Sequence, residues 1–377
     1  MDASGGKPDA HARACSWSSL RFLCVLSVSA LKTQLHFFRL HLLLACAAFC
    51  SPAADTPVSV ERLREHMREY LARLPDYTCR ITLERSRRPK ARVPFEPADR
   101  LRLEVAYTGG QELYAWPGDD RFEAGIEDLL PGHGMISNGS YALHVRNLFL
   151  RDVAEFAAPR EENCDGRPCV RLDFRVPASR SGYSLSTGSG SAPAPLAGSA
   201  WWVAADLDIV RLEVRVDRAP PSVRIAATRE TTTYARARIG EVEFVVPQVS
   251  ELMLRDRNGS ESLNRSRFDQ YRRYSASATV TYAGAVDLPV PAAPAPRPRT
   301  QSARQVTATL DRDIAEDAAI GDAFTATTVD GAQLGGRITG MRRAGKQWLI
   351  ELTMNGMIRR TLALPLKKGT TLTWNLN

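Results

Sequence analysis

Residues 58–87 read VSVERLREHMREYLARLPDYTCRITLERSR, and their hydrophobic period changes in the middle. From Val58 to Leu74, apolar residues recur every three or four positions, which predicts an amphipathic helix that Pro75 ends. From Tyr77 to Arg87, apolar and polar residues alternate, which predicts a strand with one buried and one polar face. We therefore expect one helix at the start of the folded chain, followed by β structure.

The alternation continues along the chain, with turn sequences between its segments. Asp99–Tyr107 and Glu112–Trp116 flank Thr108-Gly109-Gly110-Gln111, a good hairpin turn. Short helices are expected at Ile126–Leu130 and Tyr141–Phe149. About ten strands joined by hairpins predict a mainly β (α+β) fold: one large curved antiparallel sheet, or half-barrel, with few helices. The other expected strands are Val153–Ala158, Cys169–Val176, Ala200–Val203, Ile209–Asp217, Ser222–Arg238, Glu241–Pro247, Ser250–Arg255 and Arg267–Tyr282.

Composition divides the chain into four segments. Residues 1–54 are interpreted as an N-terminal extension with an export signal, and residues 55–288 as the large sheet, with a flexible loop at Ser179–Ser199. Residues 289–300, PVPAAPAPRPRT, predict a semi-rigid linker. Residues 301–377 predict a small β-barrel or sandwich for docking or assembly. Its expected strands are Val306–Leu310, Ala323–Val329, Gln333–Arg342, Gln347–Met354, Ile358–Leu364 and Thr371–Asn375.

The stretch Leu31–Asp55 has the layout of an export signal. It has a basic start, a short apolar core and the small-residue exit Ser51–Ala54, and Leu31 is a candidate for the true start of the protein. We expect an exported protein of the periplasm or the outer-membrane periphery of a Gram-negative bacterium. Cleavage after Ala54 would leave a soluble chain, whereas cleavage before Cys46 would leave a lipid anchor on that cysteine.

Without residues 1–54, which hold five basic and two acidic residues, the chain has 45 Lys and Arg against 40 Asp and Glu, a net charge of +5 that solubility explains. A basic run at the end of the first expected strand would be the best candidate for nucleic-acid binding. Export and the lack of interleaved aromatic residues favour a solvated strand end or a contact to anionic lipid head groups, and no nucleic-acid partner is expected. The run contains Arg85, Arg87, Arg88, Lys90 and Arg92.

Three cysteines follow the export signal. Cys164 and Cys169 enclose Asp-Gly-Arg-Pro between two expected strands, which predicts a disulfide across a hairpin turn in an oxidising compartment. A metal site is not expected there, because no partner His or Cys lies near. Cys79 has no evident partner and is expected to be buried as a small hydrophobic residue, with covalent pairing to another chain as the alternative.

No constellation of residues with catalytic or metal-binding spacing is evident. The histidines that follow the signal are His66, His133 and His144, and His66 is expected to be solvated on the polar side of the helix. No Ser lies in a nucleophile elbow. The sequence therefore predicts no catalytic residues, no metal ligands and no cofactor.

Aromatic residues are the best candidates for binding a ligand. Trp116, Trp201 and Trp202 lie on or beside expected strands, and Phe149 ends an expected helix that packs on the sheet. Adjacent Trp201 and Trp202 must point to opposite faces of their strand. We name these four residues as candidate ligand contacts, while core packing is the alternative interpretation of each.

Three segments resemble the LolA/LolB-like proteins of the bacterial envelope: Leu74–Cys79 (LPDYTC), Trp201–Val203 (WWV) and Asp208–Leu212 (DIVRL). The resemblance covers about Val58–Tyr282 and extends to uncharacterised exported proteins of acidobacteria. It implies an open half-barrel with helices lining its concave face, and an apolar cavity for acyl chains or a protein partner.

The same resemblance bears on Cys79 and on the limits of the match. Relatives carry a cysteine late in their last strand, where this chain has Gln270–Arg272, and this difference accounts for an unpaired Cys79. The loop Ser179–Ser199 and the C-terminal unit depart from the carriers.

Three hypotheses of function follow. The leading one is a non-enzymatic envelope protein whose half-barrel binds a lipid, an acylated peptide or a partner protein. The second is a structural or sensing module of envelope assembly with a self-filled core. The third, a hydrolase of envelope material, would need His133 or His144 beside a Ser or Asp in a cleft.

Overall fold

The computed structural model describes residues 58–119, 121–122, 129, 146–187, 190–274 and 305–375, all within one compact unit, Val58–Asn377. Helix α2 (Val60–Arg73) is followed far along the chain by a π-helical turn, η1 (Arg146–Leu150). The side chain of Ser59 caps α2, because its oxygen accepts a hydrogen bond from the Arg62 amide at 3.1 Å. No helix in the described part of the chain is long and apolar enough to span a membrane.

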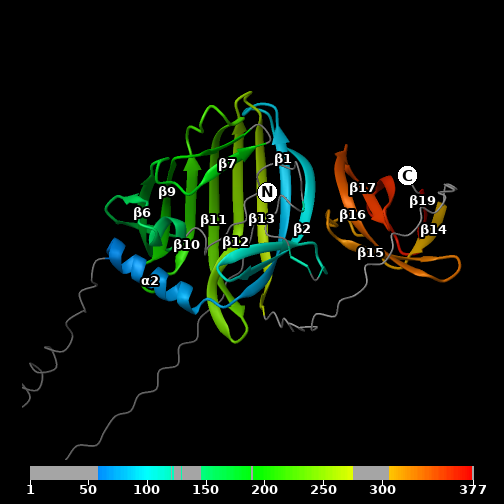
Figure 1. The fold of residues 1–377 in the computed structure, drawn as a ribbon, viewed down its shortest axis with the longest axis horizontal. Coiled ribbons are helices and arrows are strands. Elements are labelled where there is room, and N and C mark those ends of the chain that lie inside the picture. Colours follow the sequence, from blue (N-terminus) through cyan, green and yellow to red (C-terminus); the bar gives the residue numbers. More distant parts are fainter. Residues whose placement is uncertain are drawn as a thin grey trace, which may run out of the picture. The chain divides into compact units, whose positions relative to one another are not determined.

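The large sheet has eleven strands in the order β3-β2-β1-β13-β12-β11-β10-β9-β6-β4, with β5 paired to β6 (Figure 1). All of these pairings are antiparallel, which confirms the predicted mainly β fold with a large antiparallel sheet. The strands are β1 (Tyr77–Arg88), β2 (Glu96–Thr108), β3 (Gln111–Ala115), β4 (Glu155–Phe156), β5 (Arg160–Cys164), β6 (Arg167–Val176), β9 (Leu196–Val203), β10 (Ile209–Val216), β11 (Ile225–Ile239), β12 (Val242–Asp256) and β13 (Glu261–Arg273).

Several strand boundaries differ from the prediction. The two strands expected on either side of Pro247 are one strand, β12, and the register shifts between Thr233 and Tyr234 on β11, next to that proline. A bulge of this kind accommodates a residue that has no N–H to donate. The expected loop Ser179–Ser199 contains a hairpin, β7 (Ser184–Thr187) with β8 (Gly190–Pro193), and the beginning of β9.

The C-terminal residues form a separate closed barrel, as the prediction of a small all-β unit required. Each of its six strands lies within three residues of an expected strand, because short alternating segments and Gly turns mark every one of them. The strands are β14 (Gln305–Leu310), β15 (Ala323–Thr328), β16 (Gln333–Ala344), β17 (Gln347–Met354), β18 (Met357–Ala363) and β19 (Thr371–Asn375).

A loop of the barrel extends the edge of β2. The Arg102 amide donates to the Ile320 carbonyl oxygen, and the Ile320 amide donates to the Arg100 carbonyl oxygen, each at 2.8 Å. Gly321 follows with φ +103°, and a Cβ at this position would overlap the Arg102 carbonyl oxygen. Asp322 then accepts from Arg102 Nη1 at 2.6 Å. These contacts cover a part of the β2 edge that β3 does not pair.

Other expectations lie outside the described residues. They are the export signal with Cys46 and Ala54, the linker 289–300, His133, His144 and most of the two short helices between Ile126 and Phe149.

Candidate functional site

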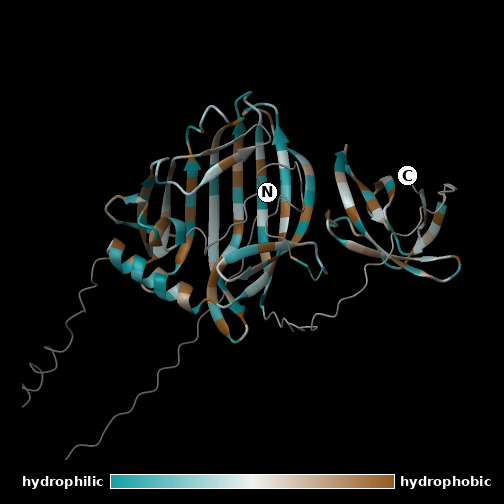
Figure 2. Ribbon diagram, in the orientation of Figure 1, coloured by the Kyte–Doolittle hydropathy of each residue, from teal (hydrophilic) through white to brown (hydrophobic). Residues whose placement is uncertain are grey.

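The two faces of the large sheet differ in polarity, and Figure 2 shows the alternation of hydrophobic and hydrophilic residues along its strands. We call the face that α2 covers the inner face and the opposite one the outer face. On β6, Leu172 packs in the cluster that includes α2, whereas the next residue, Asp173, lies on the outer face. The consecutive residues Trp202 and Trp201 of β9 divide in the same way, as expected.

Helix α2 covers part of the inner face with an apolar stripe. Leu63, Met67 and Tyr70 have exposures of only 1%, 0% and 6%. The Tyr70 hydroxyl also donates to the Val245 carbonyl oxygen at 2.6 Å, and burial raises its pKa, so that it remains a neutral donor. The rest of this inner cluster is Leu148, Phe149, Ala154, Leu172, Phe174, Val176, Ala200, Trp202, Leu207, Ile209, Leu212, Val214, Tyr234 and Val245.

Aromatic rings gather inside this cluster. The ring of Phe149 lies 5.3 Å from that of Trp202, in edge-to-face geometry, and 5.4 Å from the stacked ring of Phe156. Phe174 completes the group at 6.4 Å from Phe149. Trp202 is fully buried, and its indole Nε1 has no hydrogen-bond partner among the described residues. Such a buried donor costs about 1–3 kcal/mol unless an acceptor reaches it.

A polar strip crosses the inner face on the central strands. The hydroxyls of Thr232 and Ser250 lie 3.0 Å apart, and Ser250 also donates to Glu230 Oε1 at 3.1 Å. Further along, the guanidinium group of Arg85 donates to both oxygens of Asp99, at 2.6 and 2.5 Å. A second apolar cluster lies mainly on β1, β2 and β3. Two smaller clusters, one with Val216 and one with Leu252 and Leu254, lie toward the other end of the strands.

On the outer face, charged side chains surround Trp201. The indole ring of Trp201 lies between the guanidinium groups of Arg171 and Arg211, at 5.1 and 4.8 Å from their central carbons. Its Nε1 donates to Glu162 at 2.8 Å, and this hydrogen bond, with the nearby Arg171, holds the pKa of Glu162 below its ordinary value.

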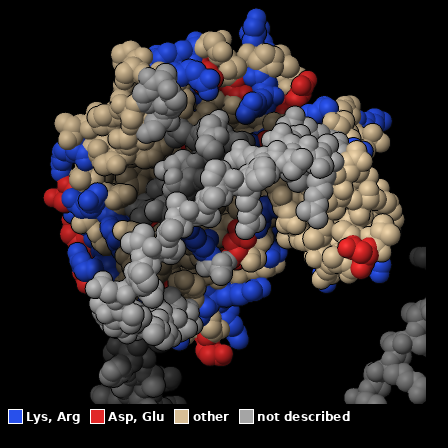
Figure 3. All heavy atoms as spheres, turned by 45° about the vertical axis from the view of Figure 1, so that its right-hand side comes forward, with Lys and Arg blue, Asp and Glu red and all other residues tan. Residues whose placement is uncertain are grey.

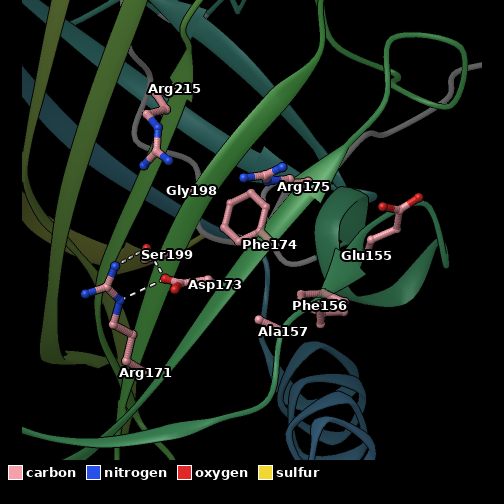
Figure 4. Close-up of a pocket in the computed structure, with 10 residues that line it drawn as sticks. All are labelled: Glu155, Phe156, Ala157, Arg171, Asp173, Phe174, Arg175, Gly198, Ser199 and Arg215. Carbon is pink, nitrogen blue, oxygen red and sulfur yellow. Dashed lines mark hydrogen bonds and ion pairs between the residues drawn. The ribbon is translucent and has the colours of Figure 1, made fainter.

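Beside this cluster lies a pocket of about 420 Å³ (Figure 4). Asp173 inside it accepts from Arg171 Nε at 2.8 Å and from the Ser199 hydroxyl at 2.6 Å. Partial burial would raise the pKa of Asp173, but these donors and Arg160 outweigh it and lower the pKa. Its carboxylate is therefore saturated by donors from its own sheet and is poorly suited to act as a base.

The four predicted ligand contacts do not lie together. Phe149 and Trp202 share the inner cluster, whereas Trp201 is on the outer face. Trp116 is partly buried at the second cluster, with the Arg337 guanidinium carbon 5.7 Å from its ring centre. Met67 and Tyr70 belong to the inner cluster but were not among the predicted contacts, although both occupy apolar positions at the three- and four-residue spacing of the helix.

The structure also places the three predicted cysteines and His66. Cys164 and Cys169 lie at disulfide distance with 5.8 Å between their Cα atoms, across the β5–β6 turn. Cys79 is buried as a free thiol, and burial raises its pKa. His66 is half-buried rather than solvated; burial lowers its pKa, which the carboxylate of Asp208 opposes. Within the described residues, no group of three or more His, Cys, Asp or Glu side chains is arranged to hold a metal ion.

Comparison with known proteins gives matches among solved structures only. No family model and no curated protein matches this chain. A LolA superfamily protein of Nitrosomonas europaea matches over 58% of this chain and 95% of its own, with 10% identity and a TM-score of 0.30. A domain named as an outer membrane lipoprotein-sorting protein, from Vibrio parahaemolyticus, matches over 57% and 93%, with 12% identity and a TM-score of 0.32.

A DUF1329 family protein of Desulfovibrio piger matches over 57% of this chain and 92% of its own, with 12% identity and a TM-score of 0.28. The expected relation to acidobacterial proteins finds no support in these matches. The chain is similar in structure to LolA superfamily and lipoprotein-sorting proteins over 57–58% of its length.

Proposed function

We propose that this protein is a non-enzymatic binding protein of the cell envelope, and that its inner face takes up a hydrophobic ligand such as a lipid or an acylated peptide. The observation that carries the proposal is the inner cluster, in which a single helix of 14 residues covers an apolar surface from several strands. Leu63, Met67 and Tyr70 of α2 are buried against this surface, and Val60 and Leu71 pack at its border. An acyl chain that replaced the helix would find the same apolar environment.

Two further features support a ligand at this place. The indole N–H of Trp202 lacks an acceptor among the described residues, and an ester or amide oxygen of a ligand would satisfy it. The polar strip of Glu230, Ser250 and Thr232 borders the cluster, where a polar head group would be accommodated. Trp202 and Phe149 are therefore the proposed ligand contacts.

A second candidate function is a structural or sensing module whose inner face is filled by its own side chains. It is favoured by the complete burial of Met67 and Trp202, both at 0% exposure. In this case α2 is a permanent part of the core, and a partner protein would recognise another surface.

Fluorescence quenching by a bromine-labelled fatty acid separates the two functions. Trp116, Trp348 and Trp374 also fluoresce, so they are first replaced by Phe. In this background a Trp201→Phe variant keeps Trp202 as the reporter of the inner face, and a Trp202→Phe variant keeps Trp201 as the reporter of the outer face. Binding at the inner face predicts strong quenching in the first variant and weak quenching in the second. Equal quenching in both variants, or none, would show that the inner face takes no such ligand.

Export is part of the proposal, with two forms of the mature protein. Cleavage after Ala54 gives a diffusible binder, and lipidation at Cys46 gives one anchored to a membrane. Labelling of growing cells with a radioactive fatty acid distinguishes these forms, since only the anchored form becomes labelled. A Cys46→Ala variant serves as the control.

A further inference from the structure

Three loops meet at one end of the large sheet, which we call the loop end: residues 89–95, 217–224 and 257–260. The pairing of Arg88 with Glu261 brings the first loop beside the third. The pairing of Ile225 with Asp256 brings the second loop beside the third. A hydrogen bond of 3.1 Å from the Arg257 amide to the Arg224 carbonyl oxygen joins the second and third loops directly.

Basic side chains predominate at the loop end. Figure 3 shows Lys and Arg gathered along the upper border of the molecule, where these loops lie, with few acidic residues between them. The exposed basic residues in the loops or at the adjoining strand ends are Arg87, Lys90, Arg92, Arg218, Arg224, Arg255 and Arg257.

The carboxylates at this end are fewer, and most are already engaged. Glu261 is buried and pairs with Arg88, and Arg255 approaches it to 3.6 Å. Asp256 pairs with Arg224 at 3.6 Å, and Asp217 with Arg215 at 3.3 Å. Glu96 is the remaining exposed carboxylate. Of the seven exposed basic residues at the loop end, only Arg224 and Arg255 form an ion pair with a described carboxylate. Arg257 donates to backbone carbonyl oxygens, which leaves Arg87, Lys90, Arg92 and Arg218 as the charges that no side-chain contact engages within the described part of the chain.

The loops are fixed by contacts of their own. Arg88 Nε donates to Glu261 at 2.7 Å, and the same guanidinium group lies 4.2 Å from the centre of the Phe95 ring, which anchors the base of the first loop. Arg257 donates to the Val223, Ala219 and Pro220 carbonyl oxygens at 3.0, 2.9 and 2.7 Å. Little entropy is therefore lost when these loops meet a flat partner.

We propose that the loop end docks the protein on an anionic phospholipid surface. Lys and Arg side chains held near such a surface are attracted by its negative potential over about 10 Å. The choice of a bilayer over an acidic protein rests on the proposed function, because a hydrophobic ligand is taken from or given to a membrane. A pocket of about 300 Å³ lies at the base of the first loop, lined by Arg87, Arg88, Pro89, Glu96, Pro97 and Ala98. The other exposed basic residues lie outside this pocket and spread over the end of the sheet, as a flat anionic surface requires.

Vesicle binding of protein purified from an exporting host tests this assignment. The variant Arg87→Gln/Lys90→Gln/Arg92→Gln removes three charges from the loop end. The control Arg238→Gln/Arg272→Gln/Arg273→Gln removes three exposed charges from the opposite end, where Arg273 pairs with Tyr77 at the start of β1. Both variants have the same net charge, so a difference between them reports position alone.

We expect the unchanged protein to bind phosphatidylcholine vesicles that contain phosphatidylglycerol and to bind pure phosphatidylcholine vesicles much more weakly. The loop-end variant should bind the anionic vesicles roughly 100-fold more weakly, and the control variant should bind like the unchanged protein. Equal losses in the two variants, or equal binding to both kinds of vesicle, would overturn the assignment. Capture of one acidic envelope protein that competes with the anionic vesicles for the loop end would overturn it in favour of a protein partner.

Fatty-acid quenching of Trp202 in the same loop-end variant separates this inference from the proposed function. Quenching that persists while vesicle binding is lost supports both the hydrophobic ligand at the inner face and the docking surface at the loop end. Vesicle binding that depends on the loop end, without quenching in any variant, keeps the docking surface and refutes the hydrophobic ligand.

Discussion

Trp201 and Trp202 are consecutive residues of one strand, yet different interactions hold them. Trp202 lies among aromatic rings with 0% exposure, whereas Trp201 is 8% exposed between two guanidinium groups and a carboxylate. The inner face is therefore stabilised by the removal of apolar surface from water, which salt and pH affect little. The outer face is stabilised by charge pairs, which both affect.

The difference between the faces has a consequence for function. An apolar surface under one short helix provides a place for a ligand whose binding does not depend on a specific pattern of hydrogen bonds. The ion pairs of the outer face keep this face hydrated, and the sheet stays rigid. Four variants or variant pairs test how far this division holds.

The largest effect is expected from Trp202→Ala. Removal of this fully buried ring should lower the free energy of unfolding by about 3–5 kcal/mol. Trp201→Ala also removes a ring that is only 8% exposed, together with two cation–π contacts and a hydrogen bond to Glu162, so it should cost a similar amount. Urea unfolding in low and high salt measures both values. Only the loss at Trp201 should become smaller in high salt, and equal salt responses of the two variants would show that the comparison is wrong.

Ion pairs of the two faces provide the next test. Asp99→Asn leaves the buried guanidinium group of Arg85 without its counter-charge and should cost about 3 kcal/mol. Glu251→Gln breaks the pair with Arg265 on the outer face, where the two side chains are 41% and 48% exposed, and should cost less than about 1 kcal/mol. Thermal unfolding in low and high salt checks the contrast, because only the outer pair is expected to respond strongly to salt. A salt response of the Asp99 variant as large as that of the Glu251 variant would contradict it.

Local patterns predicted much of this fold. The alternation in Tyr77–Arg87 gave the correct strand and its buried side, because a half-buried strand leaves its period in the sequence. The opposite directions of Trp201 and Trp202 followed from strand geometry alone. In contrast, β5 (Arg160–Cys164) was missed because most of its side chains are exposed, so it has no apolar alternation. Its place depends on the turn to β6 and on contacts such as that of Arg160 with Asp173.

The candidate site was harder to predict. The inner cluster joins α2 to residues of β9 and β12, such as Trp202 and Val245, more than a hundred residues away in the sequence. Trp116 and Trp202 both lie on or beside expected strands, but the structure places them in different clusters. The pairing of β1 with β13 joins the first strands of the chain to the last one of the sheet, and no local sequence pattern predicts it.

A smaller effect is expected from the cap of α2. Ser59→Ala should destabilise the helix by about 1 kcal/mol, and Ser59→Asp, which retains a capping oxygen, should not. If a ligand must displace α2, the weaker helix opens more often, and the apparent affinity for a fluorescent fatty acid should rise up to about fivefold. Hydrogen exchange of the α2 amides monitors the opening. Faster exchange without any gain in affinity would indicate that the helix is a permanent part of the core.

The smallest effect concerns the pH dependence of the outer face. The hydrogen bond from Trp201 and the nearby Arg171 lower the pKa of Glu162 in the folded chain below its ordinary value of 4.5. Since the unfolded chain binds the proton more readily, this contribution to stability is complete above pH 4.5 and is lost as the pH falls through the lowered pKa. Glu162→Gln removes it, so the difference in unfolding free energy between the two proteins should be constant near neutral pH and shrink in acid. A difference for Glu162→Gln that stays unchanged in acid would mean that the carboxylate does not stabilise the outer face through its charge.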